Sequence, residues 1–214
     1  MKYSLRSQQM VPYSPRGFTL IELMVAVSIF SIVMMVGVGA LLSMVAVNAR
    51  AQAINSVMNN VNAAVEQISR SARVGSSYFC SDSAVAPSPT VLQFPRDCPN
   101  GGLLIAFESS GGSIDDPNDQ TVYRLNGTQI ERSLCSGLAQ TCANGTKNGA
   151  WVAVTAPEVE ITDFRFYVTG TDPLLGGNTA QPRILISIRG TAEVQGGATQ
   201  FSVQSAVTQR LLDI

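Results

Sequence analysis

The feature that most constrains this chain is a long apolar segment near its N-terminus. Residues 23–47 contain no charged side chain, and the apolar character already begins at Phe18. This span of about 25 residues exceeds the roughly 20 that a helix needs to cross the hydrocarbon core of a bilayer. A chain of 214 residues could hardly cover such a helix on every face. The segment therefore predicts a transmembrane helix.

A short basic leader precedes the apolar segment. Residues 1–17 contain Lys2, Arg6 and Arg16 and no acidic residue. Basic flanks stay in the cytoplasm, so a single-pass orientation is expected, with the C-terminal part in the periplasm. A secretory signal peptide is the alternative, because residues 51–53 (Ala-Gln-Ala) have the form of a cleavage site. The apolar run is about twice the usual length for a signal peptide, and the helical pattern continues through residues 51–53.

Glu22 places a carboxylate close to the start of the apolar segment. Charged residues are unfavourable in hydrocarbon and usually mark a function there. A carboxylate at that depth is tolerable when a cation pairs with it. Glu22 is therefore the first candidate for a functional side chain.

Residues 16–24, Arg-Gly-Phe-Thr-Leu-Ile-Glu-Leu-Met, resemble the prepilin cleavage site of type IV pilins and type II secretion pseudopilins. The resemblance implies that prepilin peptidase cuts between Gly17 and Phe18 and methylates the new amino group of Phe18. It also implies that Glu22 pairs with the N-terminal ammonium of a neighbouring subunit. The implied partners are the peptidase, the inner membrane and other pilins or pseudopilins in a helical filament.

Amphipathic periodicity continues beyond the membrane segment. Apolar residues recur at three- and four-residue steps from Ile54 to Ala72, and the region contains no proline. One long helix is therefore expected over residues 18–74, with its transmembrane part at about 23–47, and Gly75 is expected to end it.

The remainder, residues 75–214, has the pattern of an antiparallel β-sheet domain, with short β-rich runs between turn residues. The expected fold class is thus α+β, the lollipop of the pilin-like family. The clearest hairpin joins residues 121–125 to 128–132 through Asn126-Gly127. A second surrounds Gly196-Gly197, and residues 159–168 add a further strand.

The four cysteines fit an exported domain, because disulfides persist in the periplasm and outside the cell. Three pairings are open from the sequence. Cys80 with Cys98 and Cys135 with Cys142 are favoured, because each pair closes a local, turn-rich loop. A zinc site is the alternative, but no spacing is C-x-x-C.

Asp115, Asp116 and Asp119 gather oxygen ligands in one loop, as calcium sites do. The EF-hand spacing is missing, and Asp, Asn and Pro are ordinary turn formers, so a solvated turn is the favoured interpretation. No metal or cofactor is expected.

Several function classes are disfavoured by composition. The chain has no histidine, the commonest general base, and no nucleophile motif, so an enzyme is not expected. Its 14 basic and 15 acidic residues nearly cancel, and Lys147 is the one lysine after Gly75. Binding to nucleic acid is not expected either, because capture of DNA would need clustered positive charge.

Three further stretches narrow the resemblance. Residues 68–75 look like the helix end of W-type minor pilins, and residues 157–167 and 201–207 are similar to strands of W-type pilins and J-type pseudopilins. This implies a structural minor subunit near the tip of a type IV pilus or type II secretion pseudopilus. The alternative is a filament-borne adhesin or DNA-uptake receptor.

Overall fold

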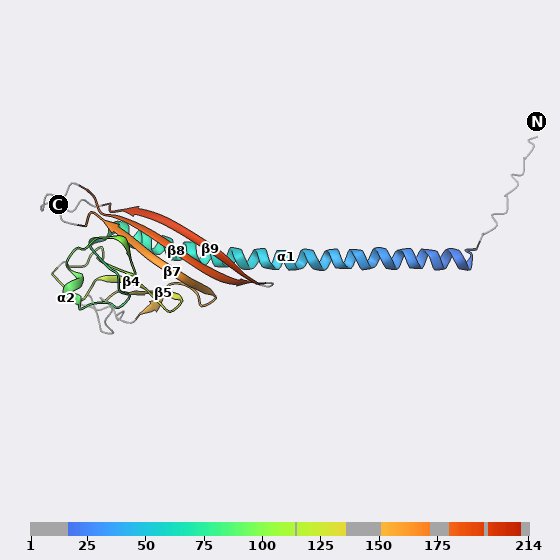
Figure 1. Ribbon diagram of the computed structural model, residues 1–214, viewed down its shortest axis with the longest axis horizontal. Coiled ribbons are helices and arrows are strands. Elements are labelled where there is room, and N and C mark those ends of the chain that lie inside the picture. The colour runs from blue at the N-terminus through green and yellow to red at the C-terminus, as the bar shows by residue number, and fades with distance from the viewer. Residues whose placement is uncertain (1–16, 114, 136–150, 172–179, 195–196, 211–214) are drawn as a thin grey trace, which may run out of the picture. The chain divides into compact units, whose positions relative to one another are not determined.

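The structure, a computed structural model, contains a helix of 55 residues, α1 (Leu20–Val74). The chain divides into two compact units, Met1–Val47 and Asn48–Ile214, and α1 contributes to both. One long helix without a break confirms the sequence prediction. The residues that the structure describes are 17–113, 115–135, 151–171, 180–194 and 197–210 (Figure 1).

The second half of α1 packs its apolar stripe against the β-sheets of its own unit. The stripe follows the helical period that the sequence predicted, although Ile54 and Met58 are only half-buried. Burial of each Val or Ile side chain contributes about 1.5–3 kcal/mol, so this stripe fixes the helix on the domain. Its buried members are Val57, Val61, Ala64, Val65, Ile68 and Ala72.

Gly75 directly follows the last residue of α1, as expected. It does not cap the helix in the left-handed conformation that usually favours glycine at this position. Its φ is not among the positive values found in the chain. A Cβ at this position would lie 2.6 Å from Cδ2 of Phe107 and 3.0 Å from the carbonyl oxygen of Glu108. Gly75 is therefore required by close packing against the strand that ends at Glu108.

The β-strands form two antiparallel sheets rather than one, and with α1 they confirm the α+β fold class. The first sheet has the order β1-β3-β4-β5-β6 and the second β2-β7-β8-β9. A four-residue helix, α2 (Pro89–Leu92), lies between β1 and β2 in the sequence. The strands are β1 (Ser76–Ser81), β2 (Cys98–Gly102), β3 (Leu104–Glu108), β4 (Thr121–Asn126), β5 (Gln129–Ser133), β6 (Val152–Ala153), β7 (Val159–Thr169), β8 (Arg183–Val194) and β9 (Gly197–Thr208).

Both predicted hairpins form, with one shift at a turn. Asn126 pairs with Gln129, so the two-residue loop is Gly127-Thr128 and lies one residue later than expected. Gly127 has φ 59°, and the first central position of a type II′ turn favours glycine. β8 and β9 pair over their whole length, from Arg183 with Thr208 to Val194 with Gly197, and residues 195–196 lie outside the described residues.

Aromatic residues join the helix end to the first sheet. Tyr78 is 1% exposed and its hydroxyl donates to the carbonyl oxygens of Ala72 and Gly75, at 2.6 and 2.7 Å. Its ring contacts Phe107, which stacks on Tyr123 at 6.1 Å between centroids. Tyr78 is therefore a core residue, because a hydroxyl buried this deeply needs such partners.

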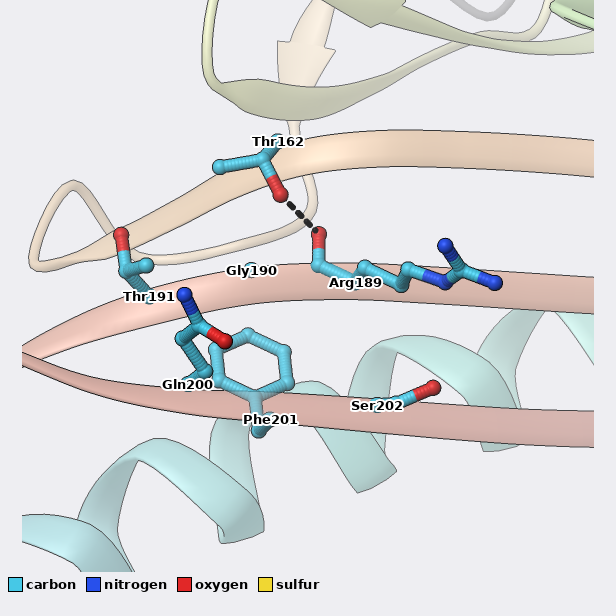
Figure 2. A pocket seen from close by; sticks show the side chains of 7 residues that line it. All are labelled: Thr162, Arg189, Gly190, Thr191, Gln200, Phe201 and Ser202. Carbon is cyan, nitrogen blue, oxygen red and sulfur yellow. Dashed lines mark hydrogen bonds between the residues drawn. The ribbon is translucent and has the colours of Figure 1, made fainter.

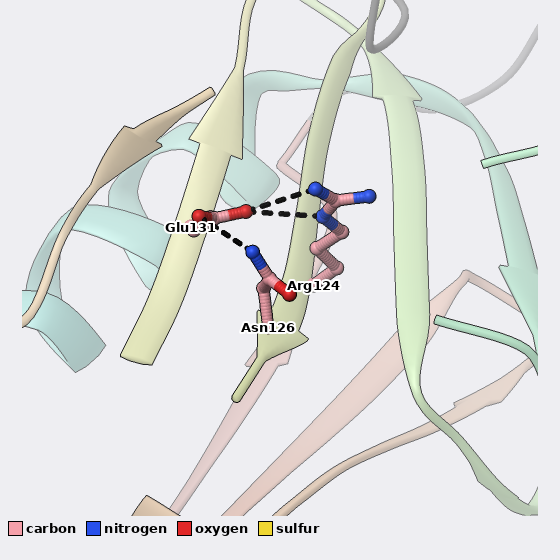
Figure 3. A network of polar contacts seen from close by, with 3 residues as sticks. All are labelled: Arg124, Asn126 and Glu131. Carbon is pink, nitrogen blue, oxygen red and sulfur yellow. Dashed lines mark hydrogen bonds and ion pairs between the residues drawn. The ribbon is translucent and has the colours of Figure 1, made fainter. Parts of the chain in front are cut away.

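A charged network stabilises the β4–β5 hairpin (Figure 3). Arg124 donates from Nε and Nη2 to Oε2 of Glu131, at 3.1 and 3.0 Å, and Asn126 donates to Oε1 of the same carboxylate. The Arg124 guanidinium also lies 3.7 Å from the ring centroid of Trp151. Trp151 thus packs within the domain and holds a cation against its face.

Candidate processing and assembly site

The start of α1 carries a helix-capping arrangement built from Thr19 and Glu22. Thr19 immediately precedes the helix, and its Oγ1 accepts a hydrogen bond from the backbone N–H of Glu22 at 3.3 Å. The carbonyl oxygen of Thr19 accepts the first helical bond, from Leu23 at 3.2 Å. Thr19 is therefore the N-cap and Glu22 the third helical residue. The sequence reasoning missed this role, although the pattern Thr-x-x-Glu before an apolar run predicts it.

The Gly17–Phe18 bond lies in non-helical backbone just before this cap. Phe18 is 82% exposed, and a Cβ on Gly17 would meet no atom within 4 Å. Nothing in the described part of the chain therefore demands a glycine at position 17. A glycine here would let another molecule, such as a peptidase, approach the backbone closely.

Glu22 is exposed in the first turn of α1. The partial positive charge at a helix N-terminus favours a carboxylate there by about 0.3–1 kcal/mol. The ion pairs found among the described residues are Arg70–Glu66, Arg124–Glu131 and Arg165–Asp163, so none of them uses Glu22. No cation of the described residues therefore pairs with its carboxylate, and a cation of another molecule could do so.

The helix beyond Glu22 presents apolar side chains in every direction. Its most apolar 18-residue window has a mean hydropathy of 2.5 and no buried residue, and the helix is long enough to cross a membrane. Ser28 and Ser31 donate to the carbonyl oxygens of Met24 and Val27, both at 2.8 Å, which satisfies their hydroxyls inside the helix. Such a surface requires cover by lipid or by other helices.

Gly37 and Gly39 lie within this apolar surface. A Cβ at either position would meet no atom within 4 Å, so the described residues give no reason for glycine there. Glycine weakens a helix by up to about 1 kcal/mol relative to alanine. We therefore expect these glycines to allow close packing against a helix of another molecule.

The cysteines lie in the β domain. Cys80 in β1 and Cys98 in β2 form a disulfide with Cα atoms 5.7 Å apart, the pairing favoured from the sequence. Gly102 packs on this bridge, because a Cβ there would lie 2.9 Å from Sγ of Cys98. Cys135 is also disulfide-bonded, whereas Cys142, its expected partner, lies outside the described residues.

Two of the three aspartates considered for calcium accept hydrogen bonds within their own loop. Oδ1 of Asp116 accepts from the backbone and side chain of Asn118, and Oδ2 of Asp119 accepts from the N–H of Ser113 at 3.0 Å. Asp115 is exposed. No group of three His, Cys, Asp or Glu side chains that could hold a metal ion occurs within the described residues.

The same loop instead approaches a buried carboxyl group that the sequence reasoning missed. Glu108, at the end of β3, is 4% exposed. Two carboxyl oxygens are buried here without a hydrogen-bond partner when both groups are ionised, namely Oε1 of Glu108 and Oδ1 of Asp119. Burial raises the pKa of Glu108 to about 8, and the carboxylates of Asp119 and Asp116 act in the same direction. A proton held between Glu108 and Asp119 satisfies both oxygens.

The domain should therefore lose stability as the pH rises. The folded state holds a proton on Glu108 between pH values near 4.5 and 8, whereas the unfolded state has released it. The free energy of unfolding should fall across that range by at most about 1.4 kcal/mol per pH unit. Thermal unfolding of the full chain in detergent at pH 5 and pH 8 measures this. Glu108→Gln keeps a hydrogen-bond donor and should make the free energy of unfolding nearly independent of pH over this range. A variant whose stability falls with pH as steeply as that of the wild type would contradict the role of Glu108.

Comparison with known proteins gives one family match. Residues 14–38 match the family model described as the prokaryotic N-terminal methylation motif. This match supports a type IV pilin-like protein that prepilin peptidase processes and that assembles into a filament. The apolar helix and the motif together fit anchoring in a membrane. Neither the curated proteins nor the solved structures contain a match to the chain.

Proposed function

We propose that the chain is a minor structural subunit of a type IV pilus or type II secretion pseudopilus. In this proposal residues 1–17 are removed, Phe18 becomes the methylated N-terminus, and residues 23–47 anchor the subunit in the inner membrane before assembly. The β domain then lies in the periplasm and the assembled subunit lies near the filament tip, like the W-type and J-type subunits that the sequence resembles. The family that carries this motif is structural rather than enzymatic.

The observation that supports the proposal best is the capped start of α1, where Glu22 forms no ion pair with the described residues. Cleavage before Phe18 would create an α-ammonium group with a pKa near 8, at nearly the same depth as the exposed Glu22 carboxylate. Each group is unfavourable alone in hydrocarbon, and pairing between two subunits satisfies both. Assembly also covers the apolar helix surface that the chain leaves open.

Replacing Glu22 tests the pairing directly. Glu22→Gln removes the charge but keeps the backbone N–H that Thr19 caps, so helix initiation is preserved. We expect normal membrane insertion and cleavage. The amount of subunit recovered in filaments should fall about tenfold or more, because loss of such a charge pair weakens the free energy of subunit binding by more than about 1.4 kcal/mol. Immunoblots of sheared filaments and of membranes measure both quantities.

Glu66 offers the matched control. It is also an exposed glutamate on α1, but it pairs with Arg70 on the same helix at 3.1 Å. Glu66→Gln should enter filaments normally, because an exposed pair of this type contributes little. Equal incorporation of Glu22→Gln and the wild type would remove the charge-pairing mechanism.

A further inference from the structure

Strand β9 is an open edge of the second sheet in the part of the chain that the structure describes. β8 pairs with one side of it along the full length, and no described strand pairs with the other side. The opposite edge of the sheet, at β2, is closed differently. There the segment that leads into β2 exchanges backbone bonds with β1, from Arg96 to Tyr78 and from Cys80 to Arg96, both at 3.0 Å.

β9 lacks the devices that normally protect an edge strand. Natural edges are kept from pairing by charged side chains, prolines, bulges or short length. β9 is twelve residues long, Gly-Ala-Thr-Gln-Phe-Ser-Val-Gln-Ser-Ala-Val-Thr, without charge or proline, and its pairing with β8 has no bulge. The neighbouring strands β7 and β8 carry the charges of this sheet instead, namely Glu160, Asp163, Arg165, Arg183, Arg189 and Glu193.

The apolar layer beneath the sheet is also incomplete at this edge. On β8, Ile186 and Ile188 are fully buried, whereas Phe201 and Val203 on β9 are only half-buried. Figure 2 shows Gln200, Phe201 and Ser202 along β9, beside an open pocket of about 360 Å³. A smaller groove, of about 100 Å³, lies between β9 and α1 and is lined by Ile54, Val57, Met58, Ala192, Thr199, Gln200 and Phe201. The Phe201 ring leans over Gly190 of β8, where a Cβ would lie 2.6 Å from its Cζ, so the outer side of β9 is left without an aromatic side chain to cover it.

We propose that β9 pairs with an antiparallel, uncharged edge strand of a different subunit of the same filament. The proposal rests on the proposed function, which supplies such a neighbour beside α1. Backbone hydrogen bonds from β9 would hold the partner strand. Because β9 offers no charged side chain, a partner strand without charges would leave no charge unpaired at the contact. Antiparallel pairing extends the order that β7, β8 and β9 already follow.

Pairing between the β9 strands of two copies of this chain does not fit, because β9 runs in the same direction as α1. Thr199 contacts Arg50, Ser205 contacts Ser69, and the N–H of Arg210 donates to Arg73. Two copies that paired their β9 strands antiparallel would have their α1 segments in opposite directions. Subunits that enter one filament with the same polarity cannot adopt that arrangement.

Photo-crosslinking of the full chain in its native cells tests the proposal. A benzoylphenylalanine is placed at Gln204, which is exposed on β9, and at Glu160, which is exposed on the interior strand β7. A third variant carries it at Val36, which is 68% exposed on the apolar half of α1. Filaments are irradiated and the crosslinked peptides are identified by mass spectrometry.

The expected result is an adduct from Gln204 to a strand of another pilin-like subunit and no adduct from Glu160. Adducts from Val36 without any from Gln204 would overturn the edge pairing while leaving the filament role intact. A Gln204 adduct to a second copy of β9 would overturn the choice of partner. Absence of filament adducts from both Val36 and Gln204 would overturn the proposed function itself.

Discussion

Replacing Gly17 with valine is expected to stop N-terminal processing and leave the chain folded. A Cβ at this position meets no atom of the described chain, so the substitution does not disturb the fold. A peptidase that lies close to this backbone would clash with the β-branched side chain. Cleavage should slow more than about tenfold, which corresponds to a barrier increase above roughly 1.4 kcal/mol. Intact mass measurement shows whether residues 1–17 remain.

Gly39→Val is the control for that experiment. Gly39 has the same open surroundings but lies well beyond the cleavage site, inside α1. Its replacement should leave processing normal, and any defect should appear later, in assembly. Normal cleavage of the Gly17→Val protein would mean that the peptidase does not read this position by size.

Removing the Cys80–Cys98 bridge should cost the β domain a large part of its stability. The two cysteines are 18 residues apart in sequence and buried, at 0% and 6% exposed. A loop of this length corresponds to about 3 kcal/mol of stabilisation through the unfolded state. The double variant Cys80→Ala, Cys98→Ala should lose about that much in denaturant unfolding of the full chain in detergent.

A reductant provides an internal comparison. Reduced wild-type protein should move toward the stability of the double variant, although Cys135 is also disulfide-bonded and adds its own change. A double variant with a denaturation midpoint equal to that of the oxidised wild type would show that this bridge does not stabilise the domain.

The helix could be predicted from sequence because its signals are local. An uncharged run, a three- and four-residue apolar period and the absence of proline all act within a few turns. The two sheets could not be separated in the same way. The apolar runs of β1 and β3 show no clean alternation, because β3 is buried at all five positions and its pairing with β1 joins segments far apart in sequence.

The role of Gly75 shows the same limit. A glycine after a helix usually indicates a C-cap, and only the folded chain brings Phe107 against its Cα. Glu108 was missed for a related reason. A glutamate at the end of an apolar strand looks like a solvated terminus until the loop that carries Asp119 returns to cover it.

The candidate site was more accessible to sequence reasoning, because residues 17–22 form one continuous motif. The structure added the capping contact between Thr19 and Glu22. It also left Gly17, Gly37 and Gly39 without a structural reason inside the described chain. We expect contacts with other molecules to explain these glycines, and a single sequence does not contain those molecules.

The N-terminus of the mature protein tests the central claim most directly. Peptide mass spectrometry and N-terminal sequencing of protein from native membranes or filaments should find a chain that begins at Phe18 with a methylated α-amino group. A mature chain that begins near Gln52, after residues 51–53, or one that retains residues 1–17, would contradict the account.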